Sequence, residues 1–277
     1  MKAKTIKKVL RKRINDWIAT IDSGIVRDAV RRDTIVTGGA IVSCLLDEPI
    51  NDIDIYFKTA ATTRTVAEYY AKKSGLPIFV RRADLNQEDR ITIESAPPHP
   101  RIAEMVQPKP NPELEHQIAY ISENAISLTG DIQIIIRFFG KIEEIHKNFD
   151  FVHTTCWYAL KSHRLCLNKE ALEAILTKEL IYTGSLYPIC SMFRIRKFIK
   201  RGWTITAGEV LKMALQISKL DLTDITVLRD QLVGVDALYF TQLLRKLEKG
   251  DSTNYVNPDF LINLINSING DEDSDLV

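Results

Sequence analysis

The stretch that decides the fold is IVTGGAIVSCLLDEPINDIDIYF, residues 35–57. Its apolar start predicts a strand that ends at a pair of glycines, Gly38-Gly39. An apolar run over residues 40–46 then predicts a short helix, and alternation of aspartate with apolar residues predicts a second strand over residues 52–57. The order strand, glycine turn, helix, strand is the frame for the rest of the chain.

Two aspartates and two glycines in this stretch are candidate site residues. Successive side chains of a strand point to opposite faces, so Asp52 and Asp54 share one face. Two close carboxylates repel each other unless a cation lies between them, and Mg²⁺ prefers one or two carboxylates completed by water and substrate phosphates. Gly38 and Gly39 let the backbone approach a phosphate, and the next helix offers its N-terminus to the anion. The pattern predicts a Mg²⁺ site, with Mn²⁺ as an alternative, beside a phosphate-binding turn.

The ordered combination is more specific than its parts, because a D-x-D pair alone is most often a solvated strand face. It resembles the signature of the DNA polymerase β superfamily of nucleotidyltransferases, and within it the CCA-adding enzyme and bacterial poly(A) polymerase group. Both glycines, both aspartates and the pair Leu45-Leu46 match that group's pattern. The group's Arg-Asp pair is replaced by Val42-Ser43, so the nucleotide that is selected cannot be read from this motif.

The resemblance implies a fold class and a domain plan. The fold is α+β: a nucleotidyltransferase-fold mixed sheet with helices, followed by a mainly helical C-terminal region. We expect a catalytic domain over residues 1–160, a helical domain over residues 161–270 and an acidic tail over residues 271–277. Proline-rich residues 95–115 predict an extended surface loop, because proline at this density disfavours helix interiors and central strands.

A third acid, Asp150, lies between Phe149 and Phe151 on a predicted strand. The resemblance gives Asp150 two roles, which both stay open. Superfamily members often bring a third acidic metal ligand from a later strand, and Asp150 suits that position. The CCA-adding group also carries a motif, R-R-D-F-T-I-N-A, that meets the ribose of the incoming nucleotide, and residues 148–154 are its counterpart in the second alignment.

Residues 187–205 resemble a basic helix of the same group, with Arg194 and Lys197 at matching spacing. With Arg201 these cations recur at i, i+3 and i+7, hence on one helix face. The resemblance implies that Arg194 and Lys197 bind the nucleotide triphosphate or the acceptor; a solvated basic face is the alternative. The first predicted helix, residues 5–21, offers the same choice between a solvated face and phosphate contact.

The implied reaction is template-independent transfer of a nucleoside monophosphate from an NTP, with release of pyrophosphate. The implied acceptor is an RNA 3′ end, with tRNA as one candidate. Two other classes stay open: an enzyme of this fold that modifies a protein or makes a nucleotide signal, and a non-catalytic RNA-binding protein.

The composition fits an ordinary globular chain of 277 residues, with 45% apolar residues and a formal net charge of +1. This charge excludes a global field that attracts nucleic acid, so any basic surface must be local. Four widely spaced cysteines indicate reduced thiols, and no apolar run reaches membrane-spanning length. We therefore expect a cytoplasmic protein without membrane contact; its oligomeric state is not indicated.

Overall fold

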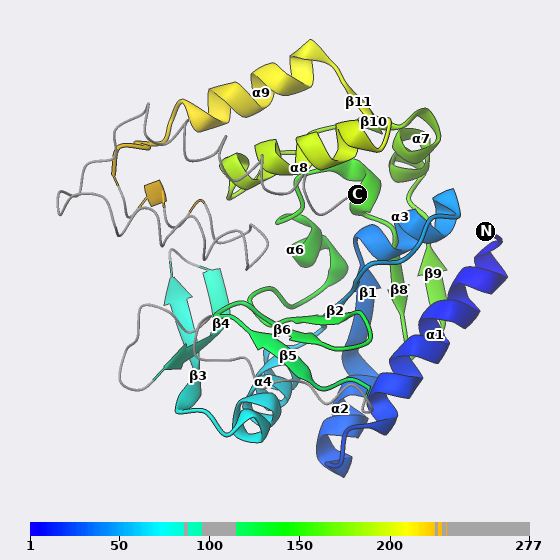
Figure 1. Cartoon of the computed structure of the whole chain (residues 1–277), viewed down its shortest axis with the longest axis vertical. Helices are drawn as coiled ribbons and strands as arrows, with labels where there is room; N and C mark the ends of the chain where they lie inside the picture. Colours follow the sequence, from blue (N-terminus) through cyan, green and yellow to red (C-terminus); the bar gives the residue numbers. More distant parts are fainter. Residues whose placement is uncertain (86–87, 96–114, 225–226, 229–230, 232–277) are drawn as a thin grey trace, which may run out of the picture. The chain divides into compact units, whose positions relative to one another are not determined.

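The computed structural model describes residues 1–85, 88–95, 115–224, 227–228 and 231 (Figure 1). The chain divides into two compact units, Met1–Thr177 and Lys178–Val277. This division lies C-terminal to the boundary expected at residue 160. Within the described residues, no helix is long and apolar enough to cross a membrane.

The first unit combines helices with a large sheet. Its helices are α1 (Ala3–Ala19), α2 (Gly24–Asp33), α3 (Gly39–Leu46), α4 (Ala60–Ser74), α6 (Ile142–His146), the 3-10 helix η1 (Val152–Thr154) and α7 (Lys169–Thr177). Its strands are β1 (Thr34–Thr37), β2 (Ile53–Phe57), β3 (Ile78–Leu85), β4 (Glu88–Ser95), β5 (Ile118–Ile121), β6 (Ala125–Leu128), β7 (Ile132–Ile135), β8 (Trp157–Ala159) and β9 (Arg164–Cys166).

Seven of these strands form one mixed sheet in the order β5-β6-β7-β2-β1-β8-β9. Strand β2 runs parallel to β7, and every other neighbouring pair in this sheet is antiparallel. The almost wholly apolar strand β7 lies inside the sheet, between β6 and β2. Strands β3 and β4 form a separate two-stranded sheet. The α+β class with a mixed sheet is therefore confirmed.

The two faces of the central pair β1–β2 have different partners. Ile53, Ile55 and Phe57 on one face of β2 are each 0% exposed. On the other face, Ile35 and Tyr56 form a buried cluster with Ile145 of α6. Burial of apolar side chains on both faces fixes the register, because a slip by one residue would turn each apolar set to the wrong side. This register positions the aspartates of β2.

The second unit begins with strand β10 (Glu179–Leu180), which is parallel to β11 (Thr204–Ile205). Between them runs α8 (Pro188–Lys200), and α9 (Ala207–Ile217) follows. The Tyr182 backbone N–H donates a 2.8 Å hydrogen bond to Glu209 of α9. The mainly helical prediction is thus confirmed for α8 and α9.

Several predicted segments lie wholly or largely outside the described residues. They are the proline-rich segment, the helices predicted after α9 and the acidic tail.

One expected strand differs in the structure. The strand predicted around Asp150 is a bend followed by η1, because the hydroxyls of Thr154 and Thr155 donate 2.8 Å hydrogen bonds to the carbonyls of Phe151 and Val152. Strands β5 and β6 are separated by a turn at Ser122, whose hydroxyl accepts a hydrogen bond from the Ala125 N–H at 3.0 Å.

Helix α2 was not predicted. Ser23 caps its N-terminus by accepting a hydrogen bond from the Val26 N–H, which is a recognisable start signal for a helix.

Candidate active site

The glycine turn lies against an aspartate of the neighbouring strand. Gly38, the N-cap of α3, has φ 103° and ψ −152°, a backbone region that only glycine adopts without strain. A Cβ atom at this position would lie 2.9 Å from Oδ2 of Asp54. A Cβ at Gly39 would meet nothing within 4 Å. The turn therefore brings its backbone next to a carboxylate, with open space at the first residue of the helix.

The two predicted metal-binding aspartates lie at the start of β2. Asp54 is half-buried within the strand and pairs in register with Gln133 of β7. Asp52 directly precedes the strand and is exposed. The fold therefore holds Asp54 beside Gly38 and leaves Asp52 open to solvent.

Thr37 and His146 form hydrogen bonds next to the glycine turn. Thr37, the last residue of β1, is 0% exposed. Its Oγ1 lies 2.8 Å from Nε2 of His146 and donates to the Cys156 carbonyl at 3.0 Å. The Gly38 N–H donates to the Thr154 carbonyl at 3.1 Å. The turn is thus anchored through β1 to α6 and η1, which come from much later in the sequence.

His146 is neutral in this position. Burial lowers the pKa of its imidazole to about 4, and the nearby Glu143 carboxylate acts weakly in the opposite direction. At neutral pH the ring can therefore keep a hydrogen bond with the Thr37 hydroxyl without placing a positive charge behind the turn.

Asp150 lies close along the chain to this anchor but not in a strand. It is 6% exposed and precedes η1, whose Thr154 carbonyl holds Gly38. Within the described residues, no three His, Cys, Asp or Glu side chains are grouped so as to hold a metal ion. Asp52, Asp54 and Asp150 therefore do not form a three-ligand cluster.

A magnesium site would instead rest on Asp52 and Asp54. Their position fits this metal, because Mg²⁺ often takes one or two carboxylates and completes its shell with water and substrate phosphates. The absent side chain at Gly38 leaves the space beside Asp54 Oδ2 that a Cβ would fill. Arg194 and Lys197 belong to α8 of the second unit, where Arg194 is half-buried and Lys197 is exposed.

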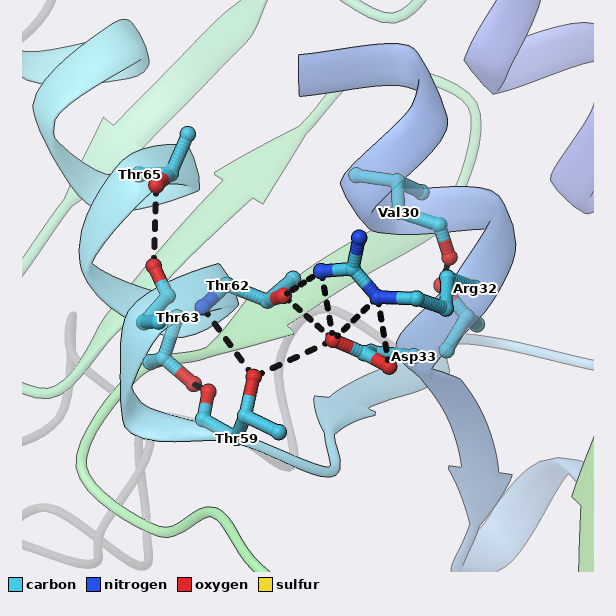
Figure 2. A network of polar contacts seen from close by, with 9 residues as sticks. Val30, Arg32, Asp33, Thr59, Thr62, Thr63 and Thr65 are labelled. Carbon is cyan, nitrogen blue, oxygen red and sulfur yellow. Dashed lines mark hydrogen bonds and ion pairs between the residues drawn. The ribbon is translucent and has the colours of Figure 1, made fainter. Parts of the chain in front are cut away.

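A different acid occupies the opposite end of the β1–β2 pair (Figure 2). Asp33 is 5% exposed and accepts hydrogen bonds from Thr59 at 3.1 Å, from Thr62 and from Arg32. Burial alone would raise the pKa of this carboxyl, but the hydrogen bonds from Thr62, Arg32 and Thr59 outweigh burial and lower it. The network ties the end of α2 to the start of α4, so Asp33 stabilises the fold.

Sequence reasoning missed Thr37 and His146. Thr37 immediately precedes the glycine pair, and His146 is the last residue of α6. Nothing in their spacing links them, since they are separated by more than a hundred residues and meet only through the sheet.

The family of this chain follows from comparison with known proteins. The family model described as "Gad2: Gabija anti-defense 2 family protein" matches residues 8–178. The chain belongs to the Gabija anti-defense 2 family. The matched region covers nearly all of the first compact unit, including Gly38, Asp52, Asp54 and Asp150. This family replaces the CCA-adding group as the more specific assignment.

This chain is similar to the Gabija anti-defense 2 protein of Bacillus phage SPbetaL7, to which it is 21% identical over 242 residues. The match covers 87% of this chain but only 51% of the relative, so the chain spans about half the length of that protein.

Similar solved structures include two CCA-adding enzymes. The Thermotoga maritima enzyme complexed with tRNA is 17% identical, with a TM-score of 0.43 and coverage of 87% of this chain and 57% of that one. The Bacillus stearothermophilus enzyme in complex with CTP is 13% identical, with a TM-score of 0.37 and coverage of 78% and 48%. The family assignment rests on the family model and not on these likenesses.

Proposed function

We propose that this protein is a metal-dependent nucleotidyltransferase whose reaction counteracts a Gabija defence. The observation that supports the proposal is the contact between the Asp54 carboxylate and the Gly38 turn, with Asp52 beside it and α3 beginning at the turn. This arrangement lies within the region that matches the anti-defense family. The reaction would transfer a nucleoside monophosphate from an NTP to an acceptor and release pyrophosphate.

Each residue of the turn has a role in this proposal. Gly38 and Gly39 would admit the triphosphate to the N-terminus of α3, where unpaired backbone N–H groups and the helix dipole favour an anion. Asp52 and Asp54 would hold Mg²⁺, or Mn²⁺. When bound, the metal would supply positive charge that neutralises the triphosphate and polarises the reacting phosphoryl group. Thr37 and His146 would keep the turn in place.

The remaining candidate residues have finer roles. Asp150 would contact the ribose or act as a further acid near the metal, and Arg194 and Lys197 would bind triphosphate or the acceptor backbone. The sequence resemblance of residues 148–154 and 187–205 to the CCA-adding group supports an RNA 3′ end as acceptor, with tRNA as one candidate.

Family membership favours a second acceptor class. A protein that counteracts a defence system acts on a component of that system or on a molecule that the system depends on. Transfer of a nucleoside monophosphate to a hydroxyl of a defence protein would do this with the same site. The transferred group would form a phosphodiester on the side chain, and pyrophosphate would leave.

One experiment tests the reaction and separates the acceptors. The protein is incubated with Mg²⁺ and each α-³²P-labelled NTP in turn, with total bacterial RNA or with purified Gabija proteins. The products are resolved on RNA and protein gels. We expect label on one acceptor class and release of pyrophosphate, both lost in Asp54→Asn. A folded wild-type protein that labels nothing and releases no pyrophosphate, yet still protects phage from Gabija, would show a non-catalytic binding protein instead.

A further inference from the structure

A dense cluster of positive charge lies on α1, away from the residues of the glycine turn. Seven of the first thirteen residues are Lys or Arg, and none is Asp or Glu. The apolar side of α1 is fully buried, with Ile6, Leu10, Ile14 and Trp17 each 0% exposed. The helix is therefore fixed in the core of the first unit and displays its cations on the outside.

Five of these cations line a hollow of about 470 Å³, which we call the α1 groove. One wall consists of Lys4, Lys7, Lys8, Arg11 and Lys12. The rest of the lining comes from Asn15 of α1 and from Tyr158 of β8 and His163 of the turn that follows β8. The hydroxyl of Tyr158 lies 3.2 Å from Nδ1 of His163, which holds the turn in place.

The charge of the α1 groove is not balanced within the part of the chain that the structure describes. Lys12 pairs with Asp16 at 2.7 Å. Lys4, Lys7, Lys8 and Arg11 make no ion pair or hydrogen bond to any described residue. Three like-charged pairs, Lys4–Lys8, Lys7–Arg11 and Lys8–Lys12, stand at i,i+4 spacing, and each such pair destabilises a helix by roughly 0.2–0.5 kcal/mol. An anionic partner would convert this repulsion into attraction.

We propose that the α1 groove binds the phosphate backbone of a single-stranded nucleic acid. Lys4 and Lys12 are about 12 Å apart along the helix, which suits successive phosphates better than one compact anion. The cations face a concave space, and a positively charged groove that follows the backbone is how many proteins bind single strands. A membrane surface fits poorly, because the apolar side chains of α1 are buried and cannot enter a bilayer.

This proposal does not depend on the transfer reaction, since binding to the α1 groove needs neither NTP nor metal. The test is fluorescence anisotropy with labelled 12-nucleotide oligouridylate and oligothymidylate, measured without NTP at several salt concentrations. We expect both strands to bind with similar affinity, because the backbone is recognised. The triple variant Lys4→Gln/Lys8→Gln/Arg11→Gln should bind at least about tenfold more weakly at physiological salt. Its slope of log K against log salt should fall by about two.

A matched control carries the same loss of charge elsewhere on the first unit. Lys58, Lys72 and Lys147 are exposed lysines outside the α1 groove, and their triple glutamine variant should bind as the wild type does. Asp54→Asn should also bind normally, which separates this proposal from the proposed reaction.

Three outcomes would overturn the proposal. The first is equal weakening by both triple variants, which would indicate a diffuse charge effect. The second is tighter binding of duplex than of single strands. The third is absence of oligonucleotide binding together with binding of vesicles that contain anionic lipid, which would assign the groove to a membrane surface.

Discussion

The two ends of the β1–β2 pair each carry an aspartate in a different setting. At one end, Asp33 is buried and surrounded by donors from Arg32, Thr59 and Thr62 (Figure 2). At the other end, Asp54 is half-buried and lies against the bare Cα of Gly38. Asp33 ends α2 just before β1 and lies in a network of hydrogen-bond donors, whereas Asp54 lies within β2 beside a glycine turn.

From this difference we expect Asp33 to contribute to the stability of the fold and Asp54 to contribute to the proposed reaction. A carboxylate that accepts several hydrogen bonds in a buried network fixes the elements that donate them, and its removal leaves those donors unsatisfied. A carboxylate beside a glycine turn at a helix N-terminus is next to a place where an anion and its counter-ion can bind. The comparison predicts that substitutions at the two ends affect different measurements.

The largest effect on activity is expected from a substitution of Asp54. Asp54→Ala should lower nucleotidyl transfer by at least about 100-fold, because it removes one of the two carboxylates proposed to hold the metal that stabilises the reacting phosphates. The melting temperature should change little. Pyrophosphate release and thermal unfolding of the same preparation provide the two readings. Near wild-type turnover in Asp54→Ala would remove this acid from the catalytic site.

The opposite pattern is expected for Asp33→Ala. This change removes a buried carboxylate and leaves Thr59, Thr62 and Arg32 without their acceptor, so it should destabilise the protein by about 3 kcal/mol. Activity per folded molecule should stay near that of the wild type. Urea unfolding measures the loss, and Thr62→Val is the milder companion, with an expected cost of about 1 kcal/mol.

The pH dependence of stability provides a second test of the role of Asp33. The pKa of Asp33 is lowered in the folded state, so its contribution to stability is present above the ordinary aspartate pKa of about 4 and is lost as pH falls below it. Asp33→Asn should therefore flatten the acid side of the stability profile. An unchanged profile would contradict the stabilising role.

The two glycines near Asp54 are expected to differ from each other in the same way, one affecting stability and the other the use of NTP. Gly38→Ala should destabilise by about 1–3 kcal/mol, because φ 103° is strained for any residue with a Cβ and that Cβ would lie 2.9 Å from Asp54 Oδ2. Gly39→Val should leave stability nearly unchanged, since its Cβ meets nothing within 4 Å. It should still weaken use of NTP, because the side chain enters the space proposed for phosphate. Unfolding curves and Michaelis constants for both variants test this difference.

How much of this could be predicted depended on distance along the chain. The β1–α3–β2 unit was predicted from local periodicity, the glycine pair and strand alternation. The short distance between Asp54 and the Gly38 turn follows from the antiparallel pairing of β1 with β2. The mixed sheet was expected from the resemblance. The setting of Asp150 was not predicted correctly, because hydroxyls of neighbouring threonines bend the backbone and periodicity carries no information on that competition.

The contacts that support the turn lie beyond local reasoning. Thr37 meets His146 only after β2 has paired with β7 and the chain has returned through α6. The balance around Asp33 likewise depends on the docking of α2 on α4, and α2 itself was missed. Local patterns thus predicted candidate site residues, whereas the contacts that hold these residues in place could be found only in the fold.

The smallest effect is expected from His146, which contacts Thr37 next to the glycine turn. This effect concerns the pH dependence of stability. Burial holds the pKa of His146 at about 4, below its ordinary value of 6.5. Between these two values the unfolded chain binds a proton that the folded protein does not bind, so stability rises with pH across this window and falls on acidification. The slope from one such group is at most about 1.4 kcal/mol per pH unit, and partial exposure of the ring makes it smaller.

His146→Gln keeps an amide that can reach Thr37 but does not titrate, so it should remove this part of the slope. His163→Gln, at an exposed histidine on the β8–β9 turn, is the matched control for the loss of an imidazole elsewhere in the first unit. Unfolding free energies from pH 4 to pH 7 decide the matter: equal slopes in wild type and His146→Gln would mean that His146 is not held neutral behind the glycine turn.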